Sequence, residues 1–328
     1  MAPKVSIVIL NWNGWKDTIE CLESLYEINY PNYDVIVVDN NSEDNSIEFI
    51  KMYAKGKLKV KSKFFEYNNI NKPLTIFECT KNRFKTNEIE VASNKKLILI
   101  KNDENCGFAK GNNIGIKYAL NHLEPDYIMI LNNDVVVEKD FLKVLVNTFK
   151  DNKIGIAGPM IRLYDKPEQI FSVGGIINWW KGRNRAILKL ESNEIKEVDY
   201  VSGCALIIKK EVFETVGLFS EEYFLYVEEI DFCVKVKKQN YKVVNNPNAL
   251  IWHKVSASVP SKVKIYYTTK NWFIFMRKFA NIPNYTFFVF WNLTFNFLFE
   301  TIKICFIYGL KFYKYYLKGL SDGLLKNN

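Results

Sequence analysis

Apolar runs rich in β-branched residues alternate with segments of helical spacing over the first 131 residues. A continuous apolar run suits a strand that is covered on both faces, as in a parallel sheet. Such runs predict strands at residues 4–10, 34–39, 97–101 and 127–131, and helical spacing predicts helices at residues 15–26, at 46–53 and from the 105–113 segment to 120. The pattern predicts an α/β fold with a mostly parallel sheet flanked by helices.

Polar residues follow these strands, and the carboxyl ends of parallel strands share one edge of the sheet. Asn11, Asp39 and Asp134 each stand at or just after a predicted strand end. A carboxylate there can accept hydrogen bonds from a ribose or a base, or bind Mg²⁺ or Mn²⁺ beside a diphosphate. The alternative is that they are turn residues, for which Asn and Asp are favoured anyway. Their repetition at three strand ends favours a binding site.

Residues 55–96 and the chain beyond residue 256 depart from this alternation. The basic, Asn-rich 55–96 segment, with strand-like patches at 57–64 and 74–79, is interpreted as an insertion. From residue 261 the pattern becomes long, aromatic and helical. We therefore predict a catalytic domain over residues 1–258 and a helical, amphipathic extension over 259–328.

The charge is local to that extension. The chain has a net charge of +9, and residues 262–328 carry ten Lys or Arg against two acids, together with 20 of the 50 aromatic residues. The six cysteines form no CxxC pair and the chain begins without a secretory signal, so we expect a reduced, cytoplasmic protein. Only two histidines are present, which excludes a zinc finger.

Three acids cluster among apolar residues at Glu228, Glu229 and Asp231. Burial would raise a carboxyl pKa there toward the range of a general base. The alternative is a helix N-terminus whose acids oppose the helix dipole. The lone His253, at the end of a short apolar run, is by itself more often structural than a ligand.

Seven ordered motifs resemble the inverting family-2 glycosyltransferases of the GT-A fold, and most of all their rhamnosyltransferase-like branch. The motifs lie at residues 5–14, 37–42, 105–113, 131–134, 201–205, 217–219 and 223–232. The resemblance covers about 250 residues apart from the insertion. It implies a nucleotide-diphosphate sugar donor carrying dTDP or UDP, with rhamnose as the family-weighted sugar, and a glycan or polyprenyl-linked acceptor.

The resemblance also assigns roles to residues. The implied nucleotide-sugar ligands are Asn11, Asn13, Asp39, Asn41, Asn105, Gly107, Phe108, Gly111, Asn112, Asn133 and Lys270. The implied metal ligands for Mg²⁺ or Mn²⁺ are Asp134 and His253, in a DXD-type motif that here lacks its first Asp. Glu229 aligns with the family's base, although the family has Asp there, and Glu228 or Asp231 is the alternative.

The extension has 21 uncharged residues between Lys278 and Glu300. Asn292 and Asn296 share one helical face, which favours an amphipathic helix lying in the membrane plane over a spanning helix. Basic and aromatic residues after it suit an anionic lipid surface, and no motif for nucleic acid accompanies them. A helical cap packed on the catalytic domain is the alternative.

The sequence thus predicts a metal-dependent, inverting glycosyltransferase for polysaccharide or lipid-linked glycan assembly, peripheral to the cytoplasmic face of the cell membrane. Two other functions remain open. One is nucleotidyl transfer, although the Gly-rich, basic loop that this chemistry usually needs does not follow Leu10. The other is a membrane tether with a degenerate catalytic domain.

Overall fold

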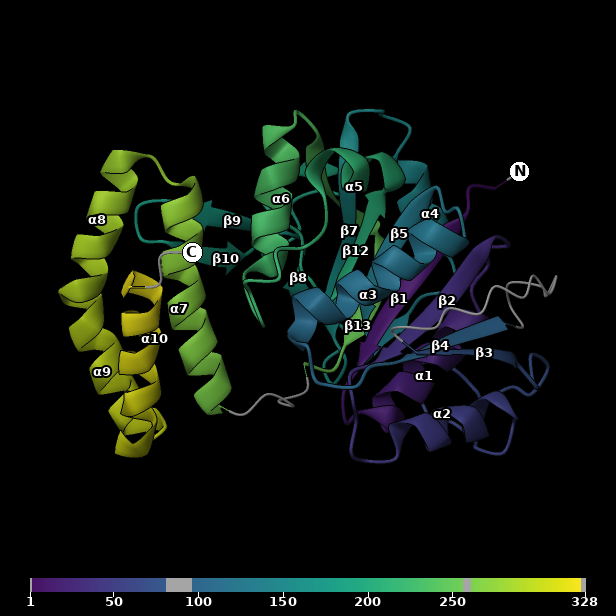
Figure 1. Ribbon diagram of the computed structural model, residues 1–328. Helices are drawn as coiled ribbons and strands as arrows, with labels where there is room; N and C mark the ends of the chain where they lie inside the picture. Colours follow the sequence, from purple (N-terminus) through teal and green to yellow (C-terminus); the bar gives the residue numbers. More distant parts are fainter. Residues whose placement is uncertain (1, 81–95, 256–260, 326–328) are drawn as a thin grey trace.

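The computed structural model describes residues 2–80, 96–255 and 261–325. Its centre is a sheet in which the first five strands run parallel in the order β5-β1-β2-β4-β3 (Figure 1). Their bounds are β1 (Val5–Asn11), β2 (Tyr33–Asp39), β3 (Thr75–Thr80), β4 (Lys96–Lys101) and β5 (Tyr127–Asn132). The predicted parallel core is confirmed.

The other half of the sheet is mixed. β12 (Ala205–Lys209) runs antiparallel between β5 and β7 (Ile154–Leu163), and β13 (Lys242–His253) pairs with β7 in parallel. The short strands β6 (Val135–Val137), β8 (Ile170–Ser172) and β11 (Lys196–Glu197) pair at its margins. This half lies beside β5, so it continues the sheet past the parallel strands.

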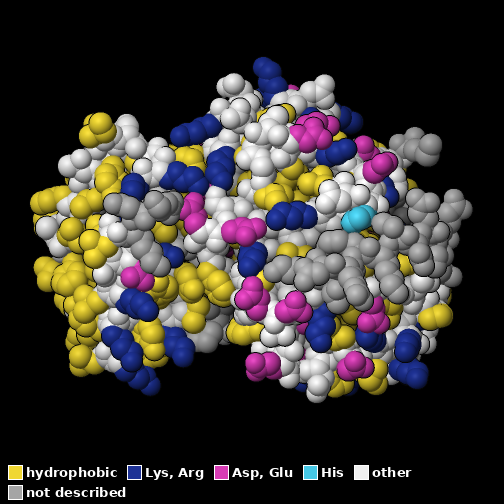
Figure 2. Space-filling model, viewed as in Figure 1, with side chains coloured by type: hydrophobic (Ala, Val, Ile, Leu, Met, Phe, Trp, Pro, Cys, Tyr) yellow, Lys and Arg dark blue, Asp and Glu magenta, His cyan; other side chains and the backbone are white. Residues whose placement is uncertain are grey.

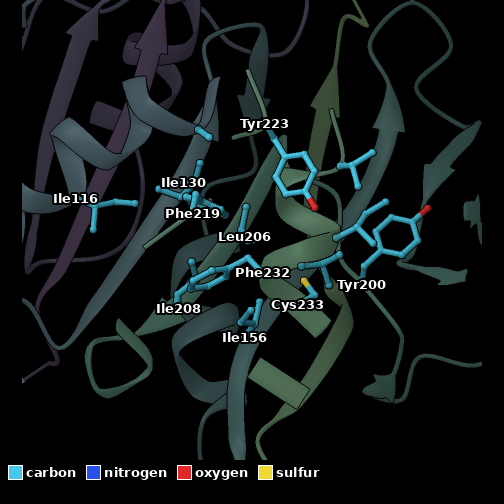
Figure 3. Packing of buried hydrophobic residues seen from close by; sticks show 14 of the residues in the cluster. Ile116, Ile130, Ile156, Tyr200, Leu206, Ile208, Phe219, Tyr223, Phe232 and Cys233 are labelled. Carbon is cyan, nitrogen blue, oxygen red and sulfur yellow. The ribbon is translucent and has the colours of Figure 1, made fainter. Parts of the chain in front are cut away.

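Each buried strand supplies two cores, because successive side chains point to opposite faces. Val8 and Val38 pack with the helices α3 (Gly107–His122), α5 (Lys210–Val216) and α6 (Glu228–Lys238), part of which Figure 3 shows. Ile7 and Val37 pack on the other face with α1 (Trp15–Tyr26), α2 (Ser46–Ala54) and α4 (Phe141–Thr148). This explains why the strands read as continuous apolar runs.

The segment interpreted as an insertion is tied into the body. Its second strand-like patch is β3, the edge strand of the sheet, but the patch at 57–64 forms no strand, so that prediction is wrong. The Nζ of Lys72 is buried 2.8 Å from the carboxylate of Glu23, which also accepts the Tyr53 hydroxyl. Residues 81–95 lie outside the described residues.

The C-terminal part is helical, as predicted. It comprises α7 (Ser261–Phe279), α8 (Ile282–Leu293), α9 (Phe295–Ile307), the 3₁₀ turn η2 (Leu310–Phe312) and α10 (Tyr313–Leu325). These helices stand beside the sheet, and the hairpin β9 (Gly175–Asn178) and β10 (Arg183–Ala186) reaches toward them (Figure 1). None of the described helices combines the length and apolar character needed to cross a bilayer. The predicted boundary at 258 falls within residues 256–260, which lie outside the described residues.

Candidate active site

Two of the predicted nucleotide ligands lie side by side at the carboxyl edge of the sheet. Asn11 and Asp39 are register partners in β1 and β2, and the Asn11 Nδ2 donates to the Asp39 carboxylate over 2.7 Å. The same carboxylate accepts the backbone N–H of Ser42 at 3.0 Å and its hydroxyl at 2.6 Å. Both side chains are almost fully buried. They form a fixed, polar edge whose geometry is set before any ligand arrives.

Two turns extend this edge toward solvent. Asn13 and Asn41 are exposed and adopt left-handed backbone conformations, with φ of 51° and 61°. Asparagine tolerates this conformation better than most residues. The Asn13 side chain accepts the backbone N–H of Glu43 at 2.7 Å, which joins the two turns. Asn133 lies behind them, where its amide donates to the Thr18 hydroxyl at 3.0 Å.

The loop before α3 is held by a residue that the sequence prediction did not include. The buried Asn40 donates to the Asn105 side chain at 2.9 Å and accepts the backbone N–H of Cys106 at 3.1 Å. Asn105 in turn accepts the backbone N–H of Gly107 at 2.9 Å. The only sequence signal for Asn40 is its place directly after Asp39, in a motif with two adjacent asparagines.

Gly107 and Phe108 connect this loop to the segment that precedes the acid cluster. Gly107 has a φ of 76°, and a Cβ at this position would lie 2.3 Å from the carbonyl oxygen of Phe224. That same carbonyl accepts the backbone N–H of Phe108 at 2.7 Å. Only glycine fits this close contact. The loop at residues 105–108 and the segment with the acids are therefore in direct contact.

Two other predicted ligands of this loop lie inside α3. A Cβ on Gly111 would lie 2.6 Å from the side chain of Leu10, so Gly111 lets α3 pack tightly on β1. Asn112 is fully buried, and its amide donates to the carbonyl of Phe108 at 3.0 Å. Both support the loop from behind.

The predicted metal ligands meet. β6 pairs with the end of β13, which sets the Nε2 of His253 3.0 Å from the carboxylate of Asp134. Both are about nine-tenths buried, and among the described atoms the buried Nδ1 of His253 has no hydrogen-bond partner. Carboxylate oxygens suit Mg²⁺ or Mn²⁺, and an imidazole nitrogen beside them favours the transition metal Mn²⁺ of these two. Within the described ranges no group of three or more His, Cys, Asp or Glu side chains forms a metal cluster.

The three acids at the start of α6 have different surroundings. Asp231 is fully buried, and its carboxylate lies 2.7 Å from the Lys278 Nζ and 2.8 Å from the Lys235 Nζ. The Tyr223 hydroxyl donates to it as well, at 3.2 Å. Its oxygens are occupied by two ammonium groups and a hydroxyl, so the geometry favours a structural role for Asp231.

Glu228 and Glu229 have raised pKa values. Burial raises the pKa of Glu229 to about 7, although backbone N–H groups at the start of α6 oppose the shift. Burial, with the adjacent Glu229 charge, raises the pKa of Glu228 well above its ordinary range. Glu229 lies over Gly203, where a Cβ would be 3.4 Å from the Glu229 side chain. A carboxyl with a pKa near neutrality suits a general base.

Cys204 is influenced by both the base candidate and the metal candidate. The pKa of the Cys204 thiol is raised first by burial, and the carboxylates of Asp134 and Glu229 also raise it. The last predicted ligand, Lys270 on α7, has its Nζ 5.8 Å from the ring centroid of Tyr267, which stacks on Phe224. Strand ends, donor-side loop, metal pair and base candidate thus surround one edge of the sheet.

Two family models match the chain. One described as "Glycosyltransferase like family 2" matches residues 76–278, and one described as "Glycosyl transferase family 2" matches residues 6–73. The chain belongs to glycosyltransferase family 2. The resemblance seen in the motifs is confirmed.

Three glycosyltransferases are similar to the chain in sequence. The chain is 28% identical to the low-salt glycan biosynthesis hexosyltransferase Agl10 of Haloferax volcanii, over 42% of this chain and 46% of that protein. It is 26% identical to the dTDP-rhamnosyl transferase RfbF of Shigella flexneri, over 58% and 66%. A dolichyl N-acetyl-alpha-D-glucosaminyl phosphate glucuronosyltransferase of Methanococcus voltae is 24% identical, over 97% and 86%. The chain therefore spans about half of the first relative and two thirds of the second.

A solved structure shows the fold. A mannosyltransferase from Pyrobaculum calidifontis, in complex with GDP-Man and Mn²⁺, superposes with a TM-score of 0.58 at 13% identity and covers 100% of this chain and 89% of its own. The expected GT-A fold with a helical C-terminal region is confirmed.

Proposed function

We propose that this protein is an inverting glycosyltransferase that uses a nucleotide-diphosphate sugar. The observation that carries this function is Glu229, a carboxyl with a pKa of about 7 next to a loop that contacts the donor-side Gly107 and Phe108. In the proposed reaction an acceptor hydroxyl attacks the anomeric carbon and gives its proton to Glu229. The bond from that carbon to the diphosphate breaks, and the nucleoside diphosphate leaves with the electron pair.

The remaining residues bind and orient the donor. The edge made by Asn11 and Asp39 supports the nucleoside, and the loop from Asn105 to Phe108 lies along the sugar diphosphate. Asp134 and His253 would hold Mg²⁺ or Mn²⁺, which supplies positive charge to the leaving diphosphate. The Mn²⁺ bound in the Pyrobaculum mannosyltransferase supports this assignment. Lys270 adds a further cation near Phe224.

The donor that we propose to test first is dTDP-rhamnose, with UDP-sugars next. The similarity to RfbF, a dTDP-rhamnosyl transferase, supports the first choice. The Methanococcus relative, named for a dolichyl phosphate substrate, supports a polyprenyl-linked acceptor or a glycan built on one. Polysaccharide or cell-envelope glycan assembly is the corresponding process.

The test is transfer and hydrolysis of dTDP- and UDP-sugars with Mn²⁺, for the wild type and for Glu229→Gln. We expect the variant to lose about 10²- to 10⁴-fold in kcat, because a general base contributes about that much. Glu214→Gln, the same change at an exposed position on α5, is the matched control. Pyrophosphate release from a nucleoside triphosphate would instead indicate a nucleotidyltransferase, and no reaction of the wild type with any donor would favour the non-catalytic tether.

We also propose that the enzyme works at the cytoplasmic surface of the cell membrane. The polarity of α8 and α9 supports this location, because two of their asparagines point inward. Asn292 and Asn296 are buried, the Asn296 amide donates to Asn292 at 2.8 Å, and Arg183 of the β9–β10 hairpin donates to Asn296. Helices of a water-soluble protein bury their apolar face instead.

The outward side of these helices is apolar, and we call it the apolar face. It consists of Ile282, Phe290, Leu293, Phe295, Leu298, Phe299, Ile302, Phe306, Ile307 and Leu310, which are 45% to 87% exposed. Figure 2 shows hydrophobic side chains gathered over this end of the molecule. An exposed apolar patch of this kind marks an interaction site. Exposed lysines at 311, 314 and 318 border it, and each contributes about 1 kcal/mol near an anionic lipid surface.

Sedimentation with anionic phospholipid vesicles tests this location. The variant Phe290→Asp/Leu298→Asp/Phe306→Asp should stay in the supernatant, as should a chain cut before Pro283, while wild type sediments and is partly released by salt. Leu188→Asp, at a 62% exposed leucine of the catalytic domain, is the control and should sediment like wild type. If wild-type protein does not sediment with vesicles and elutes as a dimer in size-exclusion chromatography, the apolar face instead binds a second copy of the chain.

A further inference from the structure

The segment before the proposed base has an unusual backbone. Tyr226 and Val227 both lie in the left-handed region, with φ of 71° and 78°, directly before Glu228 and Glu229. For a β-branched residue such as Val227 this conformation is an outlier. Each such residue costs of the order of 1–3 kcal/mol and persists only where the surroundings enforce it. Something outside the segment must therefore hold it.

Asn271 of α7 makes the contacts that hold it. Its side chain is fully buried, and its Nδ2 donates to the carbonyl of Leu225 at 2.9 Å and to that of Tyr226 at 2.8 Å. One amide group thus binds two consecutive carbonyls at the point where the chain turns. The contact spans 45 residues of sequence, so nothing local reports it.

Other side chains of α7 hold the two ends of the same segment. Tyr267 stacks on Phe224, with ring centroids 5.0 Å apart, on the side of the donor loop. Lys278 binds Asp231 in the first turn of α6. Asn271 lies between these two contacts, at the residues that enter α6.

We propose that Asn271 is a positioning residue for the transfer reaction, which fixes the strained turn and thereby directs Glu229 at the acceptor hydroxyl. The inference rests on the proposed function. This proposal also makes α7 part of the catalytic unit, although the predicted domain boundary at residue 258 separates α7 from the catalytic domain. The family match, which runs to residue 278, covers α7 as well.

The groups around Glu229 define what a pH profile will report. Glu228 and Cys233 lie on α6, and Tyr200 and Cys204 face Glu229 from the segment that leads into β12. Since burial is the main cause of the raised pKa of Glu229, a turn that relaxes toward solvent should lower that pKa. The acid limb of the kcat profile should then move to lower pH.

The test compares Asn271→Ala, Asn271→Asp and Asn271→Ser with Asn245→Ala. Asp keeps the size of the side chain but loses the N–H donors, and Ser keeps one donor. Asn245 on β13 is the matched control, because it is also buried and its amide also donates to two carbonyls, those of Gly158 at 3.2 Å and Pro159 at 2.7 Å. Melting temperature, kcat, donor KM and the pH profile of kcat are measured for each.

We expect all Ala variants to melt at lower temperature, but only the Asn271 variants to change the reaction. Ala and Asp should lower kcat by about tenfold to a hundredfold, as expected for a misplaced reacting group. Donor KM should stay within about twofold, the acid limb should move below pH 7, and Ser should recover part of kcat.

Two outcomes overturn the positioning role. In the first, Asn271→Asp or Asn271→Ser keeps the kcat and the acid limb of wild type, while Glu229→Gln loses transfer. This result rejects the role of Asn271 and leaves the proposed function intact. The other is full transfer in Glu229→Gln, which removes the proposed base and the positioning role together. A fold too weak to purify in Asn271→Ala changes nothing, because the Asp and Ser variants answer the same question.

Discussion

Replacing Asp231 by Asn separates the two roles that sequence alone leaves open for the acid cluster. The structure assigns Asp231 to an ion-pair network and supports Glu229 as the base, so the two substitutions should have opposite signatures. Asp231→Asn removes a fully buried carboxylate from two lysines. Lys278 keeps its ion pair with Glu222 at 2.9 Å, so the loss of charge pairing falls mainly on Lys235. The amide still fits the space, so the change is mainly electrostatic.

The size of the effect follows from the burial of the partners. Breaking a buried ion pair costs about 3–5 kcal/mol when the remaining charge stays buried. The side chains of Lys235 and Lys278 are 24% and 32% exposed, so they can turn partly to water, and the lower part of this range applies. With about 3 kcal/mol and about 2–4 °C per kcal/mol for a large domain, the melting temperature should fall by about 6–12 °C. The kcat, measured 20 °C below the melting temperature of each protein, should fall by less than about tenfold. The acid limb of its pH profile should stay unchanged.

The assay is thermal unfolding beside a pH profile of transfer. Asp151→Asn is the control, because Asp151 pairs with Lys242 at 2.8 Å on the surface, where an ion pair is worth about 0–1 kcal/mol. Glu229→Gln should show the reverse pattern, a large loss of kcat at an unchanged or higher melting temperature. An Asp231→Asn variant that melts like wild type but loses transfer and its acid limb would refute this reasoning and make Asp231 the base.

Three further predictions concern the rest of the site. Gly107→Ala should cost more than about 2 kcal/mol and lower kcat, because it adds a left-handed Ala and a clash with the Phe224 carbonyl; thermal unfolding and transfer measure both. The rise in melting temperature that Mn²⁺ with nucleoside diphosphate gives wild type should vanish in Asp134→Ala and in His253→Ala. The pKa of Glu229 is higher folded, about 7, than unfolded, about 4.5, so the folded state binds the proton more tightly and stability falls as pH rises through this window. In urea, Glu229→Gln should therefore be more stable than wild type at pH 8 and equal to it at pH 4.

The elements of the sheet could be predicted because their signals are local. The run at residues 4–10 became β1 (Val5–Asn11), and the polar residues at the strand ends meet because parallel strands end at one edge. The segment 57–64 shows the limit of such signals. Its alternating pattern is typical of a strand, but Val60 is buried and Phe64 stacks on Trp252 without any partner strand. The alternating pattern indicates only that every second side chain is buried. A segment forms a strand only if it also pairs with the free edge of another strand.

The roles within the acid cluster could not be predicted, because they depend on distant charges. Three acids in four positions look equivalent in the sequence, and what distinguishes Asp231 in the structure includes Lys278, 47 residues away, beside the nearer Lys235 and Tyr223. Asn40 and Asn271 were missed for the same reason. Both stand directly after a predicted ligand, Asn40 after Asp39 and Asn271 after Lys270. Their amides bond to backbone groups of other loops, and the sequence does not report that contact.

A series of side-chain contacts leads from Glu229, the proposed base, to the apolar face, and it bears on which class of acceptor the enzyme uses. Burial raises the pKa of Tyr200 to about 12, and the nearby Glu229 carboxylate adds to the shift. The Tyr200 hydroxyl accepts the Asn184 amide at 2.8 Å, and the next residue, Arg183, bonds to Asn296 on the inner side of α9. These contacts connect the proposed base through the β9–β10 hairpin to the helices that expose the apolar face. We therefore propose a lipid-linked acceptor that reaches Glu229 from the membrane side, because a soluble acceptor would gain nothing from the exposed apolar residues.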